Sequence, residues 1–518
     1  MKYSLLICVF LVSCAVNADI PCAARVVKSN FIVCVCNSTY CDSITVDKPD
    51  SGNYVTYTSS EGGLRFEKSQ GTLDNYNHSS TCCSVTLDID VNTKYQTIEG
   101  FGGAVTDSAA MNWKSLSETT QQFLIDSYFG ASGIEYNMIR VPIGGTDFST
   151  HPYAYNEIPE NDAKLSNFSL TFEDYEFKIP LIKKAFEASK SPIHLIATTW
   201  SPPPWMKTNR AYTGVSHLKT EFYQTYADYH YKFLEKYAEV GVPIWAITTT
   251  NEPISGALGV NAFNTLGWTA SAMGKWISEN LGPTIRNSTF KNLKILVADD
   301  QRIVLPYYFN IMLNEHPNAL QYIDGIAVHY YSDFITPAII LTEVNKNYPH
   351  IFIIATEACE GSFKWERERV SFGSWQRGRN YINDIIEDLN HNVVGWMDWN
   401  ICLNQQGGPT WAENNVDSPI LVNAVKDEFY KQPMFYAMGH FSKFIPRGSR
   451  RIKVTEKKFV FEKSVENVAF LTPYNTIVVV MYNDGYEKTV RIKFQDKQAV
   501  IKMTKKSITT IIFPNSAN

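Results

Sequence analysis

The stretch Ile351-Phe352-Ile353-Ile354-Ala355-Thr356 is a short apolar run that ends directly before a charged residue, Glu357. Eight runs of this kind, each followed by a longer stretch with helical spacing, succeed one another along the middle of the chain. They cover residues 98–104, 137–141, 193–198, 244–249, 293–298, 325–329, 351–356 and 393–398. Runs that are apolar on both faces and separated by helices are typical of parallel strands in a covered sheet. Eight successive units predict a (β/α)8 barrel, because a doubly wound sheet rarely needs so many.

The flanks of this region have a different pattern. After residue 450 apolar and polar residues alternate, and Asn483-Asp484-Gly485 is a hairpin turn signal. Residues 54–90 are also strand-like and rich in turns. We therefore expect an α/β chain with four parts. They are a signal peptide (1–18), a small N-terminal disulfide-bonded β segment (19–46), an all-β sandwich (47–96 together with 448–518) and the barrel (97–447).

Composition excludes several classes of protein. Of the 518 residues, 44% are hydrophobic and 19% are charged, so the chain can bury a large core and is not disordered. The net charge of −5 argues against nucleic acid as the main partner, which usually demands a basic excess. Aromatic residues make up 13% of the chain. That content suits either a site that stacks on sugar rings or an ordinary aromatic core.

The first residues resemble a targeting signal. Lys2 is followed by an apolar run over residues 5–12 and by small residues at 16–18, which predicts cleavage near Asp19. No later stretch approaches about 20 apolar residues, so we expect a soluble protein that is lumenal or secreted. Four Asn-x-Ser/Thr sequons agree with this compartment and predict glycosylation at Asn37, Asn77, Asn167 and Asn287.

Eight cysteines remain once the signal peptide is removed. Four of them cluster near the new N-terminus, at Cys22, Cys34, Cys36 and Cys41. They could form a zinc site, but in an oxidising compartment two disulfides are expected, and spacing leaves three pairings open. The neighbours Cys82 and Cys83 could form a vicinal disulfide, or one could stay free. Cys359 and Cys402 lie in apolar runs and are interpreted as buried thiols.

Two glutamates directly follow apolar strands. Glu252 closes the fourth run and Glu357 the seventh, and the C-terminal ends of barrel strands meet at one mouth. A pair of carboxylates is what glycoside hydrolysis requires, since one protonates the leaving oxygen and the other attacks or activates water. A pair of salt-bridged structural glutamates is an equally good interpretation of position alone.

The other strand ends favour the sugar site. Taken singly, each has an ordinary explanation, such as a helix cap, a core histidine or a structural ion pair. Taken together, they gather carboxylate, cationic and aromatic groups at one face. These residues are Asp107, Arg140, Trp200, His329, Tyr331, Trp396 and Trp399.

With these residues in place, the chain resembles the lysosomal glucosylceramidases (acid β-glucosidases) of glycoside hydrolase family 30. Asn251-Glu252-Pro253 and Glu357-Ala358-Cys359 are central to the resemblance. Further matching stretches are distributed along nearly the whole chain beyond the signal peptide. They are residues 33–42, 101–107, 140–142, 199–202, 205–209, 299–302, 327–331, 398–400 and 416–420. The chain departs from the mammalian pattern between residues 254 and 266 and at Asn415.

The resemblance implies roles for individual residues. Glu252 matches the general acid/base of the family and Glu357 its nucleophile. Asp107, Trp200, Asn251, Trp399 and Asn414 match glucose-binding positions. Arg140, His329 and Tyr331 match positions around the two carboxylates. In the family the N-terminal disulfides are Cys22–Cys34 and Cys36–Cys41.

The expected activity is therefore hydrolysis of glucosylceramide by double displacement through a covalent glucosyl-enzyme. The resemblance also implies a lysosomal location, a saposin-type activator and anionic lipid as partners. No cofactor is expected and no metal, since the ten histidines are scattered and no His-Glu-x-x-His spacing occurs. The alternatives are a family 30 hydrolase of xylan or β-1,6-glucan, and a catalytically silent protein that binds glycolipid.

Overall fold

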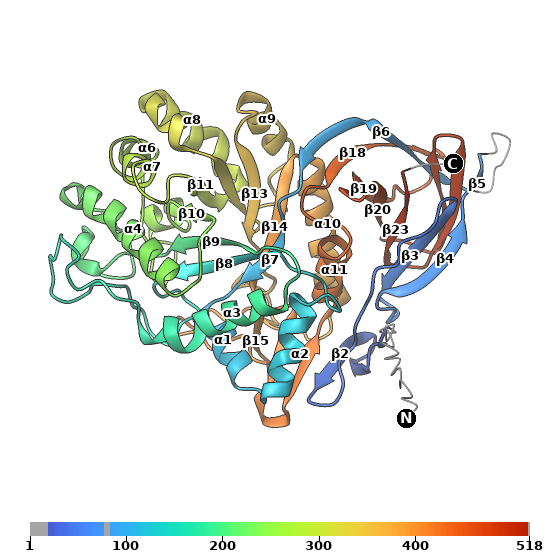
Figure 1. Cartoon of the computed structure of the whole chain (residues 1–518), viewed down its shortest axis with the longest axis horizontal. Coiled ribbons are helices and arrows are strands. Elements are labelled where there is room, and N and C mark those ends of the chain that lie inside the picture. Colours follow the sequence, from blue (N-terminus) through green and yellow to red (C-terminus); the bar gives the residue numbers. More distant parts are fainter. Residues whose placement is uncertain (1–18, 77–82, 516–518) are drawn as a thin grey trace, which may run out of the picture.

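The computed structural model describes residues 19–76 and 83–515. The expected signal peptide (residues 1–18), the sequon at Asn77 and Cys82 lie outside the described residues. The described strands form three sheets, and one of the three closes on itself as a barrel (Figure 1).

The barrel has eight strands, and every neighbouring pair is parallel. Around the barrel the order is β10, β11, β12, β13, β14, β7, β8 and β9. The expectation of a (β/α)8 barrel is confirmed. The strands are β7 (Gly100–Ala104), β8 (Met138–Ile143), β9 (His194–Thr199), β10 (Ala246–Thr248), β11 (Lys294–Gln301), β12 (Gly325–His329), β13 (Phe352–Glu357) and β14 (Val393–Asn400).

A compact apolar cluster is shared among the barrel strands. Seven of the eight strands contribute to it, through Met138, Ile196, Ala246, Leu296, Ala327, Ile354, Val394 and Met397. The eighth strand, β7, is rich in glycine because β8 lies very close to it. A Cβ atom at Gly102 would lie only 2.0 Å from the backbone oxygen of Met138. The cluster makes this part of the barrel a packed core and leaves the strand ends for polar side chains.

Helices follow the strands and surround the barrel (Figure 1). The helix α10 shows why they pack there, since Tyr381, Ile382, Ile385 and Leu389 form one buried stripe. The last helix, α11, is buried at all ten positions. The helices are α1 (Asp107–Lys114), α2 (Glu118–Tyr128), α3 (Ile179–Ala188), α4 (Tyr223–Glu239), α5 (Pro253–Leu258), α6 (Ala270–Trp276), α7 (Gly282–Arg286), α8 (Leu305–Glu315), α9 (Ile339–Asn347), α10 (Trp375–Asn390) and α11 (Pro433–Ser442).

The second sheet takes strands from both flanks of the barrel and curls over its own core (Figure 1). Its order is β4-β3-β23-β20-β19-β18-β6-β21-β22-β5. The expectation of a flanking β-sandwich is confirmed. Its strands are β3 (Asn53–Ser60), β4 (Glu67–Thr72), β5 (Asp74–Asn75), β6 (Val85–Thr97), β18 (Arg450–Lys458), β19 (Glu466–Leu471), β20 (Thr476–Asn483), β21 (Lys488–Phe494), β22 (Lys497–Met503) and β23 (Ser507–Pro514).

The N-terminal segment pairs with the chain that leaves the barrel. The hairpin of β1 (Ala24–Lys28) and β2 (Phe31–Asn37) joins β17 (Glu428–Lys431) edge to edge. The sheet continues through β16 (Ile420–Asn423) to β15 (Cys402–Asn404). The segment is therefore bound into a five-stranded sheet, which the sequence did not predict.

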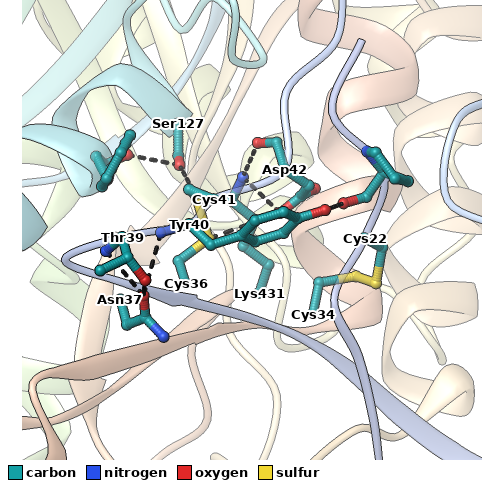
Figure 2. The surroundings of a disulfide bond; sticks show 12 residues. Cys22, Cys34, Cys36, Asn37, Thr39, Tyr40, Cys41, Asp42, Ser127 and Lys431 are labelled. Carbon is teal, nitrogen blue, oxygen red and sulfur yellow. Dashed lines mark hydrogen bonds and ion pairs between the residues drawn. A yellow bond between two sulfur atoms is a disulfide. The ribbon is translucent and has the colours of Figure 1, made fainter.

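Two disulfides hold this segment, Cys22–Cys34 and Cys36–Cys41 (Figure 2). The pairing implied by the family is confirmed. Because all four sulfurs are paired with one another, they leave no thiolate for a zinc ion. Cys359 and Cys402 are free and buried, as expected, and Cys83 is disulfide-bonded.

Among the described residues, no helix has both the length and the apolar character needed to cross a bilayer.

Candidate active site

A cavity of about 370 Å³ opens where the barrel strands end. Its volume lies within the range of small-molecule sites. Both candidate catalytic glutamates line it, together with most of the expected sugar-binding residues. The lining includes Asp147, Trp200, Asn251, Glu252, Val260, Asn261, Phe263, Gln301, Tyr331, Glu357, Cys359, Phe363, Trp399 and Asn414.

The two glutamates face each other across this cavity. Glu357 is the last residue of β13, and Glu252 precedes α5 just after β10. One carboxylate oxygen of each residue and one ring nitrogen of His329 all lie within 4.8 Å of one another. Two residues 105 positions apart in the sequence are thus brought together because their strand ends meet at one barrel mouth.

The Glu357 carboxylate is held by two donors. The guanidinium of Arg140 forms a very short ion pair with Oε2, and the hydroxyl of Tyr331 donates to Oε1 at 2.8 Å. Arg140 is fully buried and also stacks over the rings of Trp200 and Trp399. These two donors fix the orientation of the Glu357 carboxylate.

Glu252 sits in a less common backbone conformation. Its φ of 44° places a non-glycine residue in the left-handed region, where strain of this kind often accompanies function. Its carboxylate accepts hydrogen bonds from the amides of Gln301 (3.1 Å) and Asn261 (3.1 Å). The His329 ring lies 3.4 Å from the same carboxylate. Glu252 thus has two amide donors and the ring of His329 as partners, whereas the guanidinium of Arg140 donates to Glu357, Asn251 and Asp299.

Asp299 lies at the centre of the polar network. It is fully buried and binds Arg140 (2.9 Å), His329 (3.1 Å) and the hydroxyl of Thr356 (2.6 Å). A bulge in β11 between Ala298 and Asp300 puts Asp299 at a φ of 52°. Bulges of this kind re-aim a side chain next to active sites. Asp299 therefore positions both cations of the site.

The charges of the network shift its pKa values. Burial alone would lower the pKa of His329, but Glu357, Asp299 and Glu252 raise it to about 10, so the ring is an imidazolium. Burial alone would raise the pKa of Glu252, but His329, Asn261 and Arg140 bring that pKa below its usual value. With Arg140 and His329 charged, the site holds two cations and three carboxylates. One added proton makes it neutral.

The expected sugar-binding residues surround the glutamates. Trp200 and Trp399 stack at 5.0 Å between ring centroids. The side-chain oxygen of Asn251 accepts a hydrogen bond from Arg140 at 2.8 Å. Asn414 donates to Asp147 at 2.9 Å. The structure therefore brings Trp200, Asn251, Trp399 and Asn414 to one cavity, with Asp147 beside them.

Asp107 is placed elsewhere. It begins α1 and is not among the residues that line the cavity. Its carboxylate is bound by the hydroxyls of Ser149 (2.6 Å) and Tyr153 (3.0 Å) and lies 3.7 Å from the ammonium of Lys178. These partners are typical of a structural carboxylate, whereas the carboxylate that faces the cavity belongs to Asp147.

Asp147 is a buried carboxyl group that lines the cavity. Burial raises its pKa to about 7, the charges of Glu357 and Glu252 add to the rise, and the hydrogen bond from Asn414 opposes it. Sequence reasoning missed this residue because it considered only Arg140 on the second strand, and Asp147 comes four residues after β8 ends. Asp299 and Gln301 belong to the matching stretch 299–302, but no role was predicted for either residue. Their position at the end of a strand could have indicated a role in the site. No feature of the sequence indicated a role for Asn261.

The glutamate pair and His329 are also spaced as three metal ligands could be. The imidazolium state of His329 opposes that role, because a metal needs a neutral ring nitrogen. The positive charge that a metal would supply at Glu357 already comes from Arg140.

Comparison with known families decides the relationship. Residues 98–445 match the glycosyl hydrolase family 30 TIM-barrel domain, and residues 448–511 match the family 30 beta sandwich domain. The chain belongs to glycosyl hydrolase family 30. This family 30 hydrolase is 45% identical over 473 residues to the lysosomal acid glucosylceramidase of Mus musculus, which covers 90% of each chain.

Other relatives agree with this assignment. A putative glucosylceramidase of Caenorhabditis elegans, number 4 of its series, is 41% identical to this family 30 chain over 96% of both. The crystal structure of SrfJ from Salmonella typhimurium superposes with a TM-score of 0.82 at 23% identity, covering 90% of this chain and all of SrfJ. At that identity the likeness to SrfJ concerns the fold alone.

Proposed function

We propose that this family 30 hydrolase is a retaining β-glucosidase that cleaves glucosylceramide to glucose and ceramide. The close approach of the two carboxyl groups supports the retaining mechanism, and the 45% identity to a lysosomal acid glucosylceramidase supports the substrate. One oxygen of each lies within 4.8 Å of the other. Retaining enzymes hold their carboxyl groups about 5–5.5 Å apart, whereas inverting enzymes need about 6.5–9.5 Å to fit a water molecule between them.

Glu357 is assigned as the nucleophile. Arg140 and Tyr331 stabilise its negative charge and fix its orientation, which is what attack on the anomeric carbon needs. Attack forms a covalent bond from the carboxylate to the sugar and releases the glycosidic oxygen. Once Glu357 is esterified, its charge is lost, and Arg140 remains paired with Asp299.

Glu252 is assigned as the acid/base. With two cations and three carboxylates in the network, one proton neutralises the site, and Glu252 is the carboxylate without a guanidinium partner. It gives that proton to the leaving oxygen of ceramide. In the second step it takes a proton from the water that hydrolyses the glucosyl-enzyme.

The sugar pocket consists of Trp200, Trp399, Asn251, Asn414 and Asp147. The Asn251 oxygen is taken by Arg140, so its amide nitrogen is the atom left to donate to a sugar hydroxyl. Asp147 takes the role that sequence reasoning gave to Asp107, because Asp147 lines the cavity and Asp107 does not.

A lipid substrate is supported by two apolar flanks of the mouth. Val215, Leu258 and Val260 are 58–66% exposed on one flank. Phe334, Ile335 and Trp365 are 64–73% exposed on the other, where Phe363 stacks on Trp365. Exposed apolar patches beside a cavity mark interaction surfaces. We infer peripheral contact with an anionic bilayer in the lysosome lumen, helped by a saposin-type activator.

The assignment of the two glutamates is tested by labelling and stereochemistry. A mechanism-based fluorosugar should label Glu357 and leave Glu252 free, and the first glucose released should be the β anomer. Glu252→Gln should keep glycosylation by an aryl glucoside with a good leaving group, and azide should restore its turnover. Labelling of Glu252 would reverse the two roles. Release of α-glucose as the first product would refute the retaining mechanism.

Substrate class is tested separately. Purified protein should hydrolyse glucosylceramide in anionic vesicles far faster than β-1,6-glucan or xylan. A preference for either polysaccharide would reject the glucosylceramidase proposal and keep the retaining mechanism. No turnover of any glycoside would favour the silent glycolipid-binding protein.

A further inference from the structure

The turn between β18 and β19 carries three consecutive apolar residues on the outside of the molecule. Phe459, Val460 and Phe461 are 59%, 89% and 101% exposed. Single exposed apolar side chains are ordinary, but three in succession at a hairpin tip are not. We call residues 459–461 the sandwich tip.

Hydrogen bonds hold the backbone of the sandwich tip in a defined turn. The backbone N–H of Glu462 donates to the oxygen of Phe459 at 2.9 Å, and the N–H of Phe459 donates to the oxygen of Ser84 at 3.1 Å. The ammonium of Lys458 donates to the oxygen of Glu462 at 3.0 Å. Since these contacts fix the backbone, the apolar side chains are presented outward without being needed for the turn.

The surroundings of the sandwich tip are basic. Residues 457–463 contain three lysines and one acid, in a chain whose net charge is −5. Lys457 and Lys458 next to the tip are exposed. The acid beside the tip, Glu462, is paired with Lys488 at 2.8 Å. The tip thus combines apolar side chains with a local excess of positive charge.

The residues that follow the sandwich tip line a hollow that adjoins the candidate active site. A hollow of about 920 Å³ is lined by Phe334 and Phe363 of the mouth flank and by Lys463 and Ser464, which directly follow the tip region. It also shares Tyr331 with the candidate active site. An ion pair of 3.0 Å between Arg379 of α10 and Asp484 joins the two domains along this hollow.

We propose that the sandwich tip is a second membrane anchor, specific for anionic bilayers. Its apolar side chains enter the interfacial region while Lys457 and Lys458 contact lipid phosphates and carboxylates. With the mouth flank it gives two separated attachment points, which orient the cavity toward the bilayer. The inference rests on the proposed action at a lipid surface and adds an element outside the barrel.

A bilayer suits the sandwich tip better than a folded protein partner does. A stable protein interface buries about 800 Å² on each partner, spread over about 20–30 residues. The tip offers three apolar residues at a projecting turn with lysines at its base. Adjacent apolar and basic side chains match the apolar and anionic layers of a membrane interface.

The first test is a probe of local environment. An environment-sensitive fluorophore is attached at Val460→Cys, with Val425→Cys as the control, because Val425 is 98% exposed and lies between β16 and β17. The two free cysteines of the described chain are buried. Vesicles of phosphatidylserine and phosphatidylcholine should blue-shift the Val460 probe only. No shift, or an equal shift at Val425, would overturn the proposal.

The second test measures binding and activity. The double variant Val460→Asp, Phe461→Asp should lower the partition coefficient on these vesicles at least tenfold, and Val425→Asp should not change it. Each of Lys457→Ser and Lys458→Ser should cost about fivefold at low salt. Hydrolysis of a soluble aryl glucoside should be unchanged in all of these variants.

The outcomes separate this inference from the proposed function. If the wild type does not hydrolyse glucosylceramide, the proposed function fails, and the Val460 probe still reports whether the tip inserts. If the double variant partitions like the wild type, the anchor is refuted whatever the substrate. The same holds if the tip binds only a protein activator and leaves vesicle binding unchanged.

Discussion

At the residue scale, the carboxylates of Asp107 and Asp147 have different roles, one in the stability of the fold and one in the cavity. Asp107 is tied to Lys178, Ser149 and Tyr153 inside the fold, whereas Asp147 lines the cavity. Asp147→Asn should raise KM for an aryl β-glucoside and leave thermal unfolding nearly unchanged. Asp107→Asn should lower the free energy of unfolding by about 1–3 kcal/mol, because a buried cation loses a partner. Kinetics and calorimetry on the matched pair decide between them. The assignment is wrong if Asp107→Asn changes KM without changing stability.

The charge on His329 is a second feature of residue scale. Its imidazolium lowers the pKa of Glu252, so the proton that Glu252 must donate is present only at acid pH. kcat/KM should therefore fall as pH rises toward neutrality. His329→Gln removes the cation, the pKa of Glu252 then rises, and the alkaline limb of the profile should move up by about one pH unit.

The control for this profile is His151→Gln, since His151 is exposed and lies outside the network. Its profile should match that of the wild type. If the alkaline limb of the pH profile does not shift in His329→Gln, then His329 does not set the pKa of Glu252.

At the scale of elements, one buried lysine joins two loops of the mouth. Lys207 follows the short helical turn Pro204–Met206, and its ammonium donates to the backbone oxygens of Tyr212 (2.9 Å) and Thr265 (2.7 Å). The second loop also carries Asn261, which binds Glu252. The lysine therefore couples the loops to each other and to the acid/base.

Lys207→Met should loosen both loops together. Loss of both hydrogen bonds of the ammonium should lower the free energy of local opening by about 1–3 kcal/mol, because the backbone oxygen of Thr265 loses its partner. The backbone oxygen of Tyr212 still accepts from the N–H of Thr265. Hydrogen exchange should speed up in both residues 208–217 and 259–267. Lys219→Met is the control, since Lys219 donates only to Trp205. Faster exchange in a single loop would argue against the coupling.

At the scale of the whole molecule, buried carboxyl groups adapt the fold to acid. Burial raises the pKa of Asp147, Asp300 and Glu360 to about 7 and that of Asp384 to about 6. These groups hold protons in the folded state that the unfolded chain releases above a pH of about 4. Stability from this source therefore increases as pH falls from about 7 toward 4.

Two buried histidines act in the opposite direction. Burial lowers the pKa of His230 to about 4 and that of His440 to about 3, so the unfolded chain takes up their protons first as pH falls below about 6.5. The carboxyl groups outnumber the histidines, so the melting temperature should be higher at a pH of about 5 than at about 7.5.

Scanning calorimetry at the two pH values tests this balance. Glu360→Gln removes one of the carboxyl groups and should reduce the gain on acidification, and Glu118→Gln on the surface should not. A wild-type protein that loses stability between these pH values would show that the histidines dominate.

Sequence patterns predicted the eight-stranded barrel, the flanking sandwich and the two catalytic candidates at strand ends. Apolar periodicity is local and strong, and parallel strands in a closed barrel must end at the same mouth, so position alone places Glu252 and Glu357 near each other. Their catalytic roles were implied by the family resemblance. The disulfide pairing was predicted from the family resemblance, because the spacing of the four cysteines leaves three pairings open.

Which polar residues meet could not be predicted from the sequence. The bulge that aims Asp299, the cavity position of Asp147 and the pairing of β2 with β17 all depend on contacts between distant segments. The same holds for the sandwich tip, whose place beside the mouth depends on how two domains dock. Local periodicity specifies which residues form an element and which face is apolar. Side-chain approach within a few ångströms depends on register, bulges and long-range packing, which no short stretch of sequence contains.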